Sequence, residues 1–215
     1  MPSRPKPPPP TLVLLVRHGT TPTTGAVLPG RAKGLHLAES GQAQAEAVAE
    51  RLAPLAGRVA AVYASPLERT RETAKPIGRV LGHRVRTNRG LLECDFGEWT
   101  GAKLSDLRKK PEWRTVQRFP SGFRFPGGES FAEMQTRIWG TLTALVAEHP
   151  GATVVGVSHA DPIKAAVAQA MGTHLDLFQR IVISPCSVSA ILFGADGPVV
   201  LATNSTDDLA GLAPS

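Results

Sequence analysis

Cysteine is scarce in this sequence, with only Cys94 and Cys186 among 215 residues. Two thiols cannot form a disulfide framework or a zinc site of several cysteines, so neither holds this fold together. A chain of this length can bury a hydrophobic core without such cross-links. Because the fold does not depend on disulfides, a reducing cytoplasm is the expected location.

Long hydrophobic runs are also missing. No stretch approaches the roughly 20 apolar residues that a helix needs to cross a bilayer, so we expect no membrane partner. The first ten residues, MPSRPKPPPP, contain six of the 19 prolines. These prolines stand where a signal peptide would have its apolar segment, so residues 1–10 are predicted to be an extended, disordered leader.

Positive charge exceeds negative charge, with 24 Lys and Arg against 18 Asp and Glu and a net charge of +6. This excess favours anionic partners and leaves phosphate esters, nucleic acid and acidic lipid open. The tryptophans do not alternate with basic residues as they would in a base-stacking platform. The arginines are scattered along the chain and form no single stripe, so nucleic acid is not the expected partner.

Strand-like and helix-like hydrophobic patterns alternate along the chain. The patterns predict strands over residues 11–16, 59–64, 84–87 and 153–158, helices over 39–55, 65–81, 130–149 and 162–171, and a final hairpin of 187–193 and 199–203. This alternation predicts an α/β fold with a mainly parallel central sheet covered by helices on both faces. We expect one domain over residues 11–203 and a C-terminal tail over residues 204–215.

Two local predictions are specific enough to be tested by a structure. Ser65, Pro66 and Glu68 fit the N-cap, first helical position and capping box of the second helix. Residues 111–128 show no clear period, and we expect them to follow an irregular path over the surface.

Polar residues stand where the predicted strands end. Arg17 and His18 follow the first strand, Arg69 lies in the first turn of the helix after the second strand, and His159 follows the strand over 153–158. In open α/β sheets, ligands bind at the carboxyl ends of the strands. Two arginines and two histidines are therefore expected to converge there, and Glu93 is within reach of the same edge.

These side chains suit phosphoryl chemistry. Arginine forks bind phosphate oxygens bidentately, and a histidine beside two arginines has a lowered pKa and is neutral at pH 7. A neutral imidazole can attack phosphorus while the arginines and a second histidine hold the non-bridging oxygens. The leaving alkoxide needs a proton, for which Glu93 is the first candidate, with Asp95 and Glu98 as competitors.

Four segments resemble, in order, the motifs of the histidine phosphatase superfamily, which has the phosphoglycerate-mutase-like fold. They are LLVRHGTT at 14–21, SPLERTRETA at 65–74, LECDFGEWTG at 92–101 and VSH at 157–159. Gly30-Arg31, followed by Ser40-Gly41, also fits the connection usual in that family. The similarity spans roughly residues 11–203, and four ordered motifs are far more specific than one Arg-His-Gly tripeptide.

The resemblance implies roles for five residues. His18 would be the nucleophile that becomes a phosphohistidine, and Glu93 the general acid that then acts as base toward water. Arg17, Arg69 and His159 would form the phosphate pocket. The family uses no cofactor or metal, so none is expected here, and a homodimer is common in it.

Two further residues are predicted to bind the phosphate. The two residues after His159 depart from the pattern of the family. Thr24 stands where the family often has asparagine, and Arg31 follows the glycine of the connecting motif. Ala160 and Asp161 occupy positions where glycine is common, which narrows that corner of the site.

The segment 93–101 is more similar to the phosphatase branch than to the mutases, which also have longer shielding segments. The prediction is a metal-independent histidine (acid-type) phosphatase that hydrolyses a small phosphorylated metabolite. Two alternatives stay open: a phosphoglycerate-mutase-type phosphotransferase, and a non-catalytic protein that binds anions or nucleic acid on the same fold. Three arginines of the irregular segment either meet a second acidic group of the substrate or are solvated: Arg114, Arg118 and Arg124.

Overall fold

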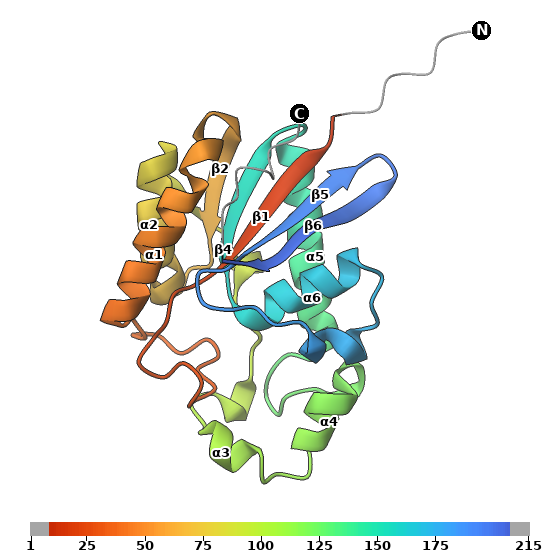
Figure 1. The fold of residues 1–215 in the computed structure, drawn as a ribbon. Helices are drawn as coiled ribbons and strands as arrows, with labels where there is room; N and C mark the ends of the chain where they lie inside the picture. Colours follow the sequence, from red (N-terminus) through yellow and green to blue (C-terminus); the bar gives the residue numbers. More distant parts are fainter. Residues whose placement is uncertain (1–8, 207–215) are drawn as a thin grey trace, which may run out of the picture.

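A computed structural model of the chain describes residues 9–206 (Figure 1). Its α-helices are α1 Glu39–Leu52, α2 Glu68–Leu81, α3 Leu104–Leu107, α4 Trp113–Arg118, α5 Phe131–Glu148 and α6 Ala160–Ala170. Its strands are β1 Thr11–Arg17, β2 Val59–Ala64, β3 Val85–Thr87, β4 Thr153–Ser158, β5 Val188–Gly194 and β6 Gly197–Ser205. Most of the predicted leader and residues 207–215 of the predicted tail lie outside the described residues. None of the described helices has the length and apolarity required to cross a membrane.

The strands form one sheet in the order β3-β2-β4-β1-β5-β6. The first four strands of that order run parallel, whereas β5 is antiparallel to both β1 and β6. β1 lies near the centre, where Val16 is in register with Val157 of β4 and Val188 of β5. The predicted α/β class with a mainly parallel sheet is confirmed.

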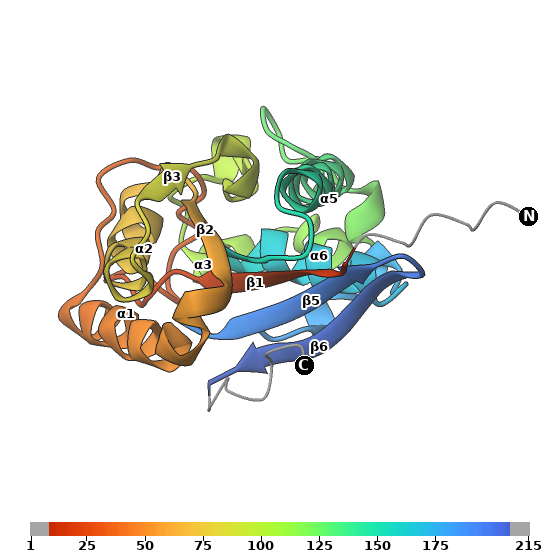
Figure 2. The ribbon, with the colours of Figure 1, turned by 90° about the horizontal axis from the view of Figure 1, so that it is seen from above.

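Both faces of the sheet are covered by helices, as Figure 2 shows. On β1, Leu12 and Leu14 pack into a core with residues of α1 and α2, whereas Val13 and Leu15 pack into a core with residues of α5 and α6. A strand buried on both faces has no polar alternation, which explains why residues 11–16 form a continuous apolar run.

The start of α2 differs from the prediction. The N-cap is Leu67 and the helix begins at Glu68, so Ser65 caps nothing. The backbone N–H of Ser65 donates instead to the carbonyl of Val157, and its hydroxyl lies 2.9 Å from Nε2 of His159. Ser65 therefore follows directly on β2 and links it by hydrogen bonds to the end of the neighbouring strand β4 and to His159.

The prediction of an irregular surface path for residues 111–128 is correct only in part: most of the segment is exposed, but it is not irregular throughout. The segment contains α4, and its Phe123 and Phe125 rings are buried. The Phe125 ring lies 5.1 Å from that of Phe131, at the start of α5. Aromatic side chains bury large apolar areas, so two of them fix a segment that has no helical or strand period.

Candidate active site

The predicted convergence at the strand ends is present in the structure. Arg17 is the last residue of β1, in register with Ser158 of β4, and His18 and His159 are the residues that follow. The ring centroids of His18 and His159 are 5.2 Å apart. In Figure 1, β1 runs down to this edge, below which the connecting loops, α3 and α4 are gathered.

A cleft of about 340 Å³ opens at this edge. Among the predicted residues, Arg17, His18, Thr24 and Glu93 line it. Arg69 and His159 are completely buried beside His18, where the Arg69 charge acts on the His18 ring. The volume is at the lower end of ligand-sized pockets and suits a small molecule.

The tautomer of His18 follows from the hydrogen bond of its ring to Gly19. Nδ1 lies 2.7 Å from the carbonyl oxygen of Gly19, and a carbonyl only accepts, so Nδ1 carries the proton. The lone pair of the neutral ring is therefore on Nε2. Burial lowers the pKa of His18 to about 3, with the Arg69 and Arg17 charges as smaller causes. The predicted lowering of the pKa is confirmed, but desolvation contributes more to it than either arginine does.

The loop that carries His18 is held by very close backbone packing. A Cβ on Gly19 would lie 2.5 Å from the carbonyl oxygen of Gly41 in α1, and a Cβ on Gly41 would lie 2.0 Å from that of Thr20. The N–H of Gly19 also donates to the Thr73 hydroxyl of α2, at 3.0 Å. Glycine is therefore required at both positions.

Arg17 and Arg69 each have guanidinium N–H donors that no described residue accepts. Arg17 donates through Nη1 to the carbonyl of Ile183, at 2.6 Å, and Arg69 through Nη2 to the carbonyl of Gly30, at 2.8 Å. Nε of Arg17 and both Nε and Nη1 of Arg69 are buried without a partner in the described part of the chain. Unpartnered buried donors are costly, so their presence indicates a site built for an anion.

Of the two ring nitrogens of His159, one is hydrogen-bonded and the other has no partner in the described chain. Its Nε2 is bonded to the Ser65 hydroxyl, while Nδ1 is buried with no partner within residues 9–206. Burial, with the Arg69 charge next, lowers the pKa of His159 well below its usual value and keeps the ring neutral. When the Ser65 hydroxyl donates to Nε2, Nδ1 carries the ring proton and can donate to a bound anion.

Glu93 has the environment of a general acid. Its carboxyl is buried, and Oε1 accepts the N–H of Cys94 at 2.9 Å. Burial raises the pKa of Glu93 to about 7, and the charge of Asp161 adds to the rise. The competing acids Asp95 and Glu98 are not among the residues that line the cleft.

Thr24 and Arg31 have different positions. Thr24 lines the cleft, with its hydroxyl 2.8 Å from the N–H of Thr21. Arg31 lies behind Glu93, where it donates through Nε to the Glu93 carbonyl and pairs with Asp95 and Glu129 at 3.2 Å and 2.8 Å. Its guanidinium supports the loop of residues 92–101 that carries Glu93, here called the acid loop. The structure does not bring Arg31 to the predicted phosphate-binding residues.

Arg137 of α5 is a supporting residue that the sequence pattern did not reveal. Its guanidinium donates to the carbonyls of Gly90, Leu92 and Glu93 at 2.8–3.2 Å. It also forms a two-pronged ion pair with Glu129, at 2.8 Å and 2.9 Å. The sequence signal for this role was a charged residue next to the core positions of the helix predicted over residues 130–149. Arg137 holds the backbone of the loop that presents Glu93.

Replacing Arg137 with methionine is expected to lower the free energy of unfolding by about 2 kcal/mol, because several buried acceptors lose their donor. Denaturant unfolding measures this loss as a lower midpoint with an unchanged slope. The matched variant is Arg118→Met, at an exposed position, and we expect it to stay within about 0.5 kcal/mol of the wild type. Equal midpoints for the two variants would contradict the bracing role.

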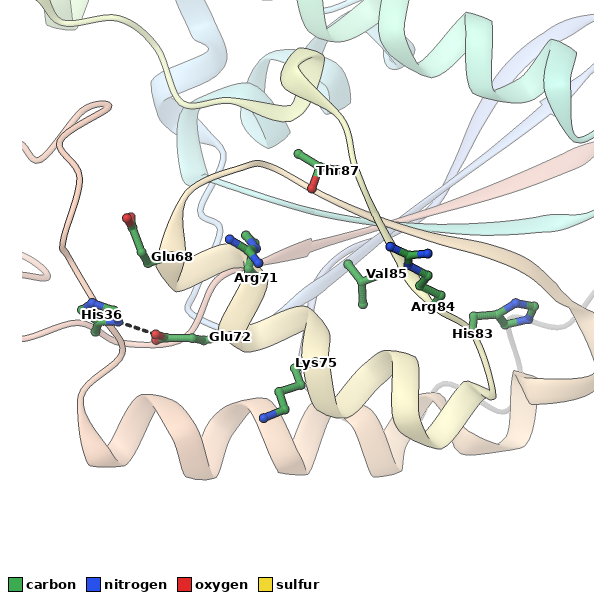
Figure 3. A pocket seen from close by; sticks show the side chains of 9 residues that line it. All are labelled: His36, Glu68, Arg71, Glu72, Lys75, His83, Arg84, Val85 and Thr87. Atoms are coloured by element: carbon green, nitrogen blue, oxygen red, sulfur yellow. Dashed lines mark hydrogen bonds and ion pairs between the residues drawn. The ribbon is translucent and has the colours of Figure 1, made fainter.

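A larger groove of about 720 Å³ lies over α2 and β3 (Figure 3). Arg71, Lys75 and Arg84 project around it, and His36 pairs with Glu72 at its rim. Its lining includes none of the predicted catalytic or binding residues. The residues suited to phosphoryl chemistry are therefore concentrated in the smaller cleft.

Comparison with known families and proteins gives a consistent result. Residues 13–206 match the family described as the histidine phosphatase superfamily (branch 1). The chain is 34% identical over 195 residues to a bifunctional protein of Mycobacterium tuberculosis, and it spans about half the length (52%) of that relative. It is 32% identical to phosphoserine phosphatase 1 of Hydrogenobacter thermophilus, with 90% of this chain and 92% of the relative aligned.

Two other comparisons bear on the type of reaction. A probable phosphoglycerate mutase of Cronobacter sakazakii is 32% identical, with 83% of each chain aligned. A mutant phosphoserine phosphatase from Entamoeba histolytica, solved in complex with phosphoserine, superposes with a TM-score of 0.82. That match has 25% identity and covers 92% of this chain and 98% of the other.

Proposed function

Because this chain belongs to the histidine phosphatase superfamily, we propose that it hydrolyses small phosphomonoesters through a phosphohistidine intermediate on His18. One observation carries the proposal: the hydrogen bond from Nδ1 to Gly19 leaves a lone pair on Nε2, next to buried arginine donors that have no partner in the described chain. A neutral nucleophile beside an anion pocket is what attack on a phosphate ester requires.

In the first step, Nε2 of His18 attacks phosphorus and the bond from phosphorus to the ester oxygen breaks. The non-bridging oxygens accept hydrogen bonds from Arg17, Arg69 and the Nδ1–H of His159. Protonated Glu93 gives its proton to the leaving alkoxide, so the alcohol departs neutral and Glu93 becomes a carboxylate. Most of the catalysis is positioning and electrostatic stabilisation.

In the second step, the Glu93 carboxylate takes a proton from a water molecule, whose oxygen attacks the phosphohistidine. The bond between phosphorus and Nε2 breaks, inorganic phosphate leaves, and both His18 and Glu93 return to their starting states. Thr24 lines the cleft and contributes a hydroxyl to the phosphate.

The named relatives support hydrolysis, and one of them supports the alternative of phosphoryl transfer to an alcohol. Phosphoserine phosphatases occur among both the curated relatives and the solved structures. The mutase relative favours a second reaction on the same intermediate, in which an alcohol replaces water as the acceptor. Phosphate release in the absence of an acceptor alcohol distinguishes hydrolysis from transfer.

Release of inorganic phosphate from p-nitrophenyl phosphate is expected to stay within about twofold of its value when EDTA is added, because every group in the scheme is a protein side chain. In the described chain, no three His, Cys, Asp or Glu side chains are grouped so that they could hold a metal ion. The measurement compares initial rates with EDTA, without it, and with Mg²⁺ restored. Activity that disappears with EDTA and returns with Mg²⁺ would overturn the metal-independent scheme.

A further inference from the structure

An ion pair on α6 lines the same cleft without being among the groups proposed to bind the phosphate or to transfer a proton. Lys164 Nζ lies 3.3 Å from Oδ1 of Asp161 and 3.1 Å from Oε1 of Gln179, and all three residues line the cleft. The side chains of Asp161 and Lys164 are each only 17% exposed. An exposed pair at this helical spacing contributes little to stability, whereas this pair is partly buried in the lining of the cleft that also holds Arg17 and Glu93.

Each member of the pair keeps one hydrogen-bonding group unused. An ammonium has three donors, and two of those of Lys164 are taken by Asp161 and Gln179, while Nζ also lies 5.9 Å from the centroid of the Phe178 ring, which accepts no N–H hydrogen bond from it. Oδ1 of Asp161 accepts from Lys164, whereas Oδ2 has no hydrogen-bond partner within residues 9–206. The cleft therefore offers one cationic donor and one anionic acceptor side by side.

The balance of charge restricts what can lie against this pair. Arg17 and Arg69 oppose the phosphate, and the charges of Asp161 and Lys164 cancel. An alcohol part with only a carboxylate would place like charges together at Asp161, and one with only an ammonium would do so at Lys164. A group with both charges satisfies both side chains, and the adjoining wall of Ile181, Val182 and Ile183 is apolar, which suits a short carbon chain.

We propose, building on the proposed phosphatase function, that Asp161 and Lys164 determine substrate specificity by binding a zwitterionic alcohol part. The substrate is then the phosphate ester of a hydroxy-amino acid, with its ammonium at Oδ2 of Asp161 and its carboxylate at Nζ of Lys164.

Two compounds that differ in one group provide the test. O-phosphoserine carries an ammonium where 3-phosphoglycerate carries a hydroxyl, and the two are otherwise alike. The wild type is expected to show a kcat/KM at least about tenfold higher for O-phosphoserine, because 3-phosphoglycerate brings an unmatched carboxylate toward Asp161. O-phosphoethanolamine, which lacks the carboxylate, is expected to fall below O-phosphoserine by a similar factor.

The ratio of kcat/KM for the two compounds is then measured in variants, so that a general loss of activity cancels. Asp161→Asn is expected to reduce the preference for O-phosphoserine over 3-phosphoglycerate to within about threefold. Lys164→Gln is expected to remove the preference for O-phosphoserine over O-phosphoethanolamine. The matched control is Asp196→Asn, at an exposed position in the turn between β5 and β6, which keeps the wild-type ratios.

The outcomes separate this proposal from the proposed function. Hydrolysis of p-nitrophenyl phosphate with no preference for O-phosphoserine would overturn the zwitterion proposal and leave the phosphatase function standing. No release from any compound would overturn the phosphatase function. Calorimetric titration of His18→Ala with O-phosphoserine and 3-phosphoglycerate then tests the binding preference without turnover, and equal affinities would overturn the zwitterion proposal.

Discussion

Replacement of His18 with alanine is expected to reduce phosphate release at least about 1,000-fold, as loss of the nucleophile does in enzymes that act through a covalent intermediate. Within residues 9–206 the imidazole makes a single side-chain hydrogen bond, to the neighbouring Gly19 carbonyl, so its removal leaves the surrounding packing largely intact. Initial rates on p-nitrophenyl phosphate measure the loss, and unchanged denaturant unfolding confirms that the variant is folded.

The control for this variant is His36→Ala, because His36 is exposed and pairs with Glu72 outside the cleft. It is expected to keep the wild-type rate. The wild type should also accumulate an acid-labile phosphoryl group during turnover that His18→Ala lacks. If His18→Ala retained as much as a tenth of the wild-type rate, His18 could not be the nucleophile.

Replacement of Glu93 with glutamine is expected to affect substrates according to their leaving group. A sugar or alkyl alkoxide needs a proton to leave, so its release should slow by about 100-fold or more, whereas a nitrophenolate leaves without one and should slow by less than about tenfold. Single-turnover kinetics on both substrates measure the first step directly. Equal losses on the two would transfer the acid role to Asp95 or Glu98.

The pH dependence follows from the same carboxyl group. Because burial and Asp161 raise the pKa of Glu93 to about 7, the proton-donating form predominates below that pH and is lost above it. The rate of alkoxide release should therefore fall as the pH rises through 7, with no such fall for a nitrophenolate. The falling limb should disappear in Glu93→Gln, and its persistence there would contradict the assignment.

The positions of the proposed catalytic groups were most predictable from the sequence where these groups follow buried strands. Residues 11–16 and 153–158 are strands whose apolar runs are unmistakable, so the polar residues directly after them, Arg17, His18 and His159, had to meet at one edge. Their side-chain partners were less predictable. Ser65 carries every local signal of an N-cap, yet its hydroxyl bonds to His159, which lies 94 residues further along the chain.

Arg31 and Arg137 also show that the local sequence does not reveal the partners of a side chain. Arg31 follows a motif glycine and is predicted to bind the phosphate, but its donors go to the Glu93 carbonyl, to Asp95 and to Glu129, which precedes α5. Arg137 stands in a helix whose pattern predicts only core packing, and it holds the Glu93 loop. An arginine has the same local sequence signature whether it binds substrate or protein carbonyls, and only the tertiary contacts decide between them.

The close approach of Gly19 and Gly41 has a consequence for how the cleft can adapt. Because neither backbone has room for a methyl group, α1 and the loop that carries His18 are packed in direct backbone contact, with no space between them for the cleft to expand. A substrate that needs more room must gain it elsewhere in the lining of the cleft, which includes the apolar side chains of Leu104, Ile181 and Val182. Substitutions at those positions can therefore change the space for a ligand while the contact between Gly19 and Gly41 stays as it is.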